Sequence, residues 1–127
     1  MSRERVVNTI AGLGAAAFLV FGTWPFFWPK SFYDQLATFE PYNVHFIHDI
    51  GAFQIGIGVA LALALWRKSD ALLAVLGGAG VGSVFHAVAH VRDNDLGGKD
   101  TDVFVFGFMA VLLLAGAWVR LMTPVRR

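Results

Sequence analysis

Four long stretches of this chain contain no Asp, Glu, Lys or Arg, and they cover residues 6–29, 50–66, 71–91 and 103–119. A helix that crosses a bilayer needs about 17 to 25 apolar residues, and each stretch meets that length. A soluble core helix of this length would show a polar face, which these stretches lack. The sequence therefore predicts an all-α fold, a four-transmembrane-helix antiparallel bundle that forms a single integral-membrane domain over 1–127.

The predicted helices span about 5–28, 43–67, 70–92 and 102–122, with turn-forming residues between them. Pro25 should end or kink the first helix. Ser31 and Asp34 have the spacing of a helix cap, which indicates a short helix lying on the membrane surface before the second span. Asn43 is a good N-cap for that span. The turn after it is very short, so the second and third helices should be antiparallel neighbours.

Basic residues divide unevenly between the two ends of the predicted bundle. Seven of the ten lie at the chain termini and in the loop after the second span, and three lie in the other loops and helix ends. The positive-inside rule then places both termini in the cytoplasm, with the protein a multi-pass component of the cell membrane. The basic residues flank membrane segments and form no patch with interleaved aromatic residues, so the lipid bilayer is the expected partner and nucleic acid is not.

All four histidines, together with Asp49, fall at one end of two consecutive predicted helices. His45, His48 and Asp49 open the second helix, and His86 and His90 close the third. In antiparallel helices these side chains share one membrane depth, with Asp49 and His86 each about 9 Å inside the helix end. Small residues every four positions suggest that both histidine pairs face the bundle interior on helix-packing stripes. The stripes are His48, Ala52, Gly56, Ala60 and Ala64, and Ala74, Gly78, Gly82, His86 and His90.

Histidines spaced three or four residues apart on one helix can reach a single metal ion. We expect His45, His48, Asp49, His86 and His90 to bind a divalent transition metal, with Zn or Cu foremost and Fe as a further choice. The chain has no cysteine, so thiolate ligands are excluded. Asp49 or Asp93 is the candidate general base of a metal-dependent membrane enzyme.

Two other readings of the same residues stay open. Haem b could be held by one axial histidine from each helix, His48 and His86, in a haem- or quinone-linked redox protein. Alternatively, the histidines are interhelical hydrogen-bonding groups in a non-enzymatic subunit or assembly factor, in which case the partner is another membrane protein or a second copy of the chain.

Two segments carry a resemblance to a known family. These are Asp49-Ile50-Gly51-Ala52-Phe53-Gln54-Ile55-Gly56-Ile57-Gly58 and the earlier Phe21-Gly22-Thr23-Trp24-Pro25. With four short spans, the chain resembles the small DoxX-like bacterial membrane proteins over most of its length. The resemblance implies a four-helix bundle in the cytoplasmic membrane and no settled activity. The two histidine sets match no pattern of that family, so the site prediction depends on this sequence alone.

Overall fold

The computed structural model describes residues 2–67, 71–92 and 99–123, and the regular structure in these residues is helical. Four of the helices are long and apolar enough to cross a membrane, and the fifth is short. This confirms the predicted fold class. The helices are α1 (Arg3–Phe27), α2 (Pro29–Gln35), α3 (Val44–Arg67), α4 (Ala71–Arg92) and α5 (Asp102–Leu121).

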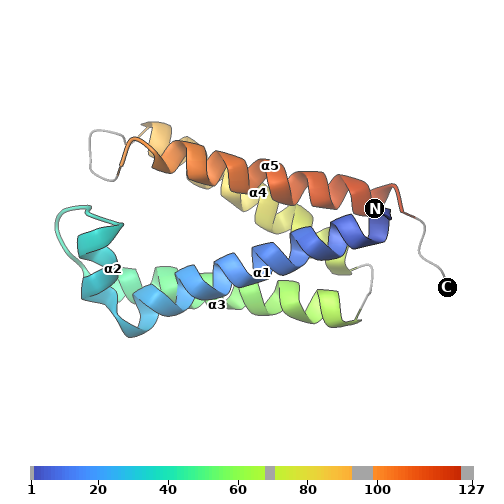
Figure 1. The fold of residues 1–127 in the computed structure, drawn as a ribbon. Coiled ribbons are helices and arrows are strands. Elements are labelled where there is room, and N and C mark those ends of the chain that lie inside the picture. The colour runs from blue at the N-terminus through green and yellow to red at the C-terminus, as the bar shows by residue number, and fades with distance from the viewer. Residues whose placement is uncertain (1, 68–70, 93–98, 124–127) are drawn as a thin grey trace.

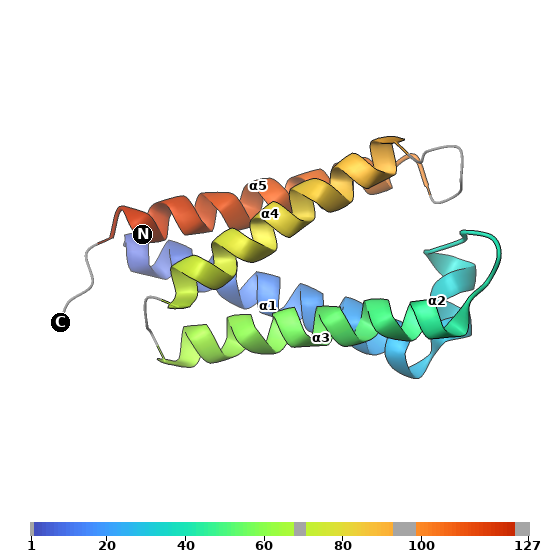
Figure 2. The same cartoon turned by 180° about the vertical axis from the view of Figure 1, so that it is seen from behind.

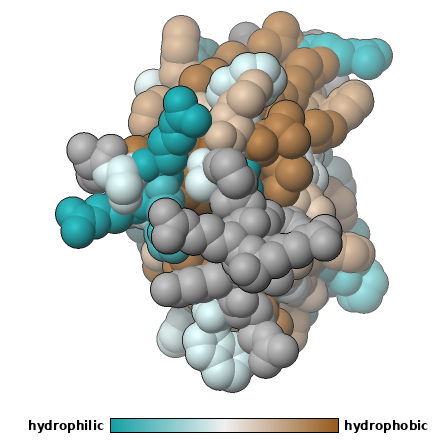
Figure 3. Space-filling view, turned by 90° about the vertical axis from the view of Figure 1, so that its right-hand side faces the viewer, coloured by the Kyte–Doolittle hydropathy of each residue, from teal (hydrophilic) through white to brown (hydrophobic). Residues whose placement is uncertain are grey.

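Large apolar side chains cover much of the outside of the long helices. Phe53 on α3 is 76% exposed and Phe104 on α5 is 77% exposed. In water such a surface would drive aggregation, whereas in a bilayer it contacts lipid chains without cost. The chain is an integral membrane protein. Figure 3 looks at the end that carries both chain termini, where hydrophilic side chains project beside hydrophobic ones.

The helix ends follow local chemistry, with two departures from the sequence prediction. Asn43 caps α3 as predicted, because its Oδ1 accepts from the backbone N–H of Phe46. α1 continues past Pro25 to Phe27. The proline removes the backbone donor that would have bonded to the carbonyl of Phe21, and the helix continues for two residues beyond it. Ser31 was expected to cap α2 but lies inside it, because the helix already begins at Pro29.

The four long helices form two hairpins in space. α1 packs chiefly on α3, and α4 packs chiefly on α5. Figures 1 and 2 show that the two pairs approach each other at the end with the termini and diverge toward the end with α2. α3 and α4 run antiparallel as predicted, but they make few contacts with each other. The short turn joins them without holding them together along their length.

Glycines set the close packing within each hairpin. A Cβ atom on Gly51 would lie 2.8 Å from the backbone oxygen of Gly22, so α1 and α3 touch through their backbones. A Cβ on Gly80 would lie 2.8 Å from the Leu114 side chain, which brings α4 against α5. The glycines of the predicted stripes make no close contact, since a Cβ on Gly56, Gly78 or Gly82 would meet nothing within 4 Å, whereas Ala64 of the α3 stripe is buried in the core.

Two buried clusters stabilise opposite ends of the molecule. The larger one includes Leu61, Leu76 and Leu113, which have no exposed surface, and it joins α1, α3, α4 and α5 at the end with the termini. The smaller one consists of Phe32, Tyr33 and Ile47 and fixes α2 against α3. Between these clusters the two hairpins separate, and the space between them holds the candidate site.

Candidate functional site

A cavity of about 850 Å³ lies between the two hairpins, and we call it the central cavity. Its walls come from all five helices and from the segment that connects α2 with α3. Most of its lining is apolar, with Phe18, Ile57, Phe106 and Met109 among the lining side chains. A cavity of this size lies in the range that accommodates a drug-sized or lipid-sized molecule.

Polar groups line the central cavity on the α4–α5 side. His86 and His90 come from α4, and Asp102 is the first residue of α5. His90 Nδ1 lies 3.8 Å from Asp102 Oδ2, and the two side chains are 12% and 10% exposed. Asp102 Oδ2 also accepts a hydrogen bond of 2.9 Å from the backbone N–H of Lys99. These contacts fix the carboxylate where α5 begins, at the N-terminal end where a negative charge is stabilised.

Phe106 organises the two histidines. Its ring centroid lies 3.8 Å from that of His86 and 4.8 Å from that of His90, with the planes 22° apart in both pairs. One helical turn separates Phe106 from Asp102, so a single face of α5 supports both imidazoles. The stack holds the rings of α4 against α5, and both histidines line the cavity.

The mouth of the central cavity is closed in part by two contacts between the hairpins. Lys99 Nζ donates a hydrogen bond of 2.6 Å to the backbone oxygen of Gln35 at the end of α2. The ring of Phe39, in the α2–α3 connection, meets that of His90 edge to face at 6.0 Å. Tyr33 lies beside this segment, and its hydrogen bond to Glu40 raises the pKa of the Tyr33 hydroxyl to about 12. That hydroxyl therefore stays protonated at physiological pH.

The histidines of α3 do not join those of α4. His45 pairs with Asp49 of its own helix, at 3.6 Å between Nε2 and Oδ2, and its side chain is 85% exposed. His48 packs against Phe26 of α1, with ring centroids 5.6 Å apart. His45, His48 and Asp49 are all absent from the lining of the central cavity, whereas His86 is part of it. The predicted meeting of all five side chains fails because α3 and α4 diverge at this end of the bundle.

The cofactor prediction is wrong for the same reason. Across residues 2–67, 71–92 and 99–123 there is no group of three or more His, Cys, Asp or Glu side chains that could hold a metal ion. A tightly held Zn or Cu site needs about three or four such ligands, as does a non-haem Fe site. The haem alternative loses its basis as well, because His48 packs on α1 while His86 stacks on α5. Asp93, the other candidate base, lies outside the described residues.

Sequence reasoning missed Gln54, which lines the central cavity from α3. Across the described parts of the chain, neither the Gln54 amide nor the His86 imidazole forms a hydrogen bond. Ser83, also in the lining, differs because its hydroxyl donates to the backbone oxygen of Ala79. A signal for Gln54 was present, since it is the one strongly polar side chain in the apolar stretch 50–66.

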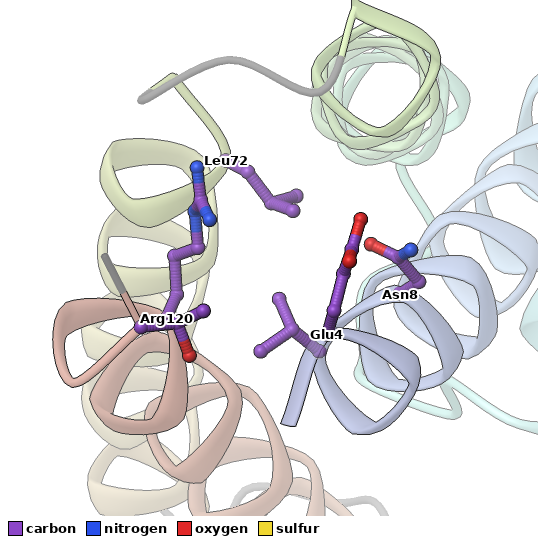
Figure 4. A pocket seen from close by; sticks show the side chains of 6 residues that line it. Glu4, Asn8, Leu72 and Arg120 are labelled. Atoms are coloured by element: carbon purple, nitrogen blue, oxygen red, sulfur yellow. The ribbon is translucent and has the colours of Figure 1, made fainter. Parts of the chain in front are cut away.

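A second, much smaller cavity lies near the termini, and Figure 4 shows its labelled side chains. Glu4 and Asn8 of α1 face it from one side, and Leu72 of α4 and Arg120 of α5 from the other. Its volume is about 40 Å³, which is room for about one water molecule and not for an organic ligand. The central cavity is therefore the candidate site.

Comparison with protein-family models, with curated proteins and with solved structures gives no match for this chain. The similarity to DoxX-like proteins stays a prediction from the sequence, and the function has to be argued from the geometry of the central cavity.

Proposed function

We propose that this integral membrane protein binds a neutral, lipid-soluble molecule in the central cavity. The observation that carries the proposal is His86, a side chain without a hydrogen-bond partner in the described residues, on the wall of a largely apolar cavity of about 850 Å³. A polar group at membrane depth is costly to leave unpaired, and such groups mark functional sites. A ligand with a hydroxyl or carbonyl oxygen would pair with the imidazole and fill the apolar space.

The charges around the mouth favour a neutral head group. Asp102 contributes one negative charge and Lys99 one positive charge, and both residues line the cavity. Both charges already have partners, since Asp102 lies beside His90 and accepts from the Lys99 backbone N–H, and Lys99 Nζ donates to the Gln35 backbone oxygen. A neutral oxygen group needs neither charge, because it hydrogen-bonds to an imidazole.

The uneven distribution of basic residues supports an orientation for this binding protein. With both termini in the cytoplasm, α2 and the mouth of the central cavity lie at the outer side of the cell membrane. A lipid-soluble ligand would then enter from the outer leaflet or from the outer interface.

A titration with 1-hexadecanol, followed by native mass spectrometry of the detergent-purified protein, tests the proposal. The native chain should bind about one molecule. His86→Leu should bind at least about fivefold more weakly, because a buried hydrogen bond is worth roughly 1 kcal/mol or more. His45→Leu is the matched control, since His45 lies outside the cavity and should leave binding unchanged. Failure of the native chain to bind the alcohol, or equal losses in both variants, would refute the proposal.

A further inference from the structure

Gln54 lies near the middle of the membrane-spanning length of its helix. α3 has 24 residues and begins at Val44, so Gln54 is about 15 Å from that end of a helix about 36 Å long. Because the hydrocarbon core of a bilayer is about 30 Å thick, this depth is close to its centre. Water is scarce there, and a primary amide that stays unpaired is costly.

The Gln54 side chain nevertheless has no hydrogen-bond partner among the described residues, although amides on membrane helices usually bond across to a neighbouring helix. It lines the central cavity, and its Cβ atom borders the close contact between α3 and Gly22 of α1. Gly51, one turn earlier on α3, lies in the same contact. The sequence therefore places a polar group on the cavity side of α3, where a bound molecule can reach it.

His86 faces the same cavity from the opposite hairpin. It lies six residues before Arg92, the last residue of α4, which corresponds to about 9 Å from that end of the helix. Figure 2 shows that the start of α3 and the end of α4 lie at the same end of the molecule. The two unpaired polar groups therefore line one cavity from opposite hairpins.

We infer that the central cavity selects a lipid-soluble molecule with two hydrogen-bonding oxygen groups, one that pairs with His86 and a second that pairs with Gln54. The inference rests on the proposed function. An amide both donates and accepts, and so does a neutral imidazole, so a hydroxyl group suits either position. A simple fatty alcohol places only hydrocarbon beside Gln54 and would leave the amide unpaired.

Two probes that differ by one hydroxyl group test this selectivity. 1-Hexadecanol carries a single terminal oxygen, and 1,6-hexadecanediol carries a second one part-way along the same chain. In native mass spectrometry titrations, the native chain should bind the diol about tenfold more tightly than the alcohol, because the second hydroxyl pairs with the Gln54 amide. In Gln54→Leu, the affinity for the diol should fall to that for the alcohol, and the affinity for the alcohol should not change.

Gln35→Leu is the matched control, because Gln35 is exposed on α2 and its side chain bonds to Ser31 outside the cavity. It should keep the tenfold preference for the diol. If Gln54→Leu does not purify, Gln54→Met carries the same test, and the comparison of probes on the native chain needs no variant.

The outcomes separate the inference from the proposed function. Equal affinities of the native chain for both probes would overturn the inference alone, and so would an equal loss of both affinities in Gln54→Leu. Failure of the native chain to bind either probe would overturn the proposed function as well.

Discussion

Gly51→Ala should destabilise the fold although alanine is the better helix former. The added Cβ atom would lie 2.8 Å from the Gly22 oxygen and 2.8 Å from the Phe26 nitrogen, both of which are backbone atoms of α1. A backbone atom cannot move aside by changing rotamer, so α1 and α3 must separate along part of their contact. Overpacking of this kind costs about 1 to 3 kcal/mol.

The intrinsic helix preference opposes this cost. Replacing glycine by alanine in a helix gains about 1 kcal/mol. The net destabilisation expected for Gly51→Ala is therefore up to about 2 kcal/mol. Gly82→Ala is the matched control, because it makes the same chemical change on α4 at a position where a Cβ meets nothing within 4 Å. Gly82→Ala should keep the full gain in helix preference and be at least as stable as the native chain.

Unfolding by sodium dodecyl sulfate in detergent micelles, followed by circular dichroism, measures the free energy of unfolding of Gly51→Ala and of Gly82→Ala. The two variants should differ by the overpacking cost of about 1 to 3 kcal/mol, with Gly51→Ala the less stable. Equal stabilities would refute the assignment of the α1–α3 contact to Gly51. A lower stability of Gly82→Ala would instead restore the packing stripe that the sequence suggested on α4.

Two further predictions concern the cavity and the membrane orientation. Gly82→Phe should fold but bind 1-hexadecanol at least about tenfold more weakly, because the added ring enters the central cavity. Gly77→Phe, at a position outside the lining, should bind 1-hexadecanol as the native chain does. A titration of both variants with 1-hexadecanol tests this prediction. Because the native chain has no cysteine, a single introduced cysteine reports on which side of the membrane it lies. In intact cells an impermeant thiol reagent should label Asp100→Cys and should not label Ser2→Cys. The reverse labelling pattern would invert the proposed orientation.

The elements of this fold could be predicted from the sequence because each is a local property. An apolar stretch of membrane-spanning length forms a helix in lipid whatever its neighbours are, since all its backbone hydrogen bonds are internal. This reasoning placed the four spans, and the Asn43 cap followed from the chemistry of one side chain. The candidate site was found only in part, because His86 and His90 line the central cavity while His45, His48 and Asp49 do not.

Tertiary structure decided which faces of the helices meet. In a membrane the lipid-facing and protein-facing sides of a helix are both apolar, so hydropathy does not distinguish them. Gly51 and Gly82 look equivalent in the sequence, yet one touches a backbone and the other borders open space. The divergence of the two hairpins follows from such contacts summed along the helices. It separates His48 from His86 and brings Gln54 into a shared cavity, which no local pattern in the sequence could specify.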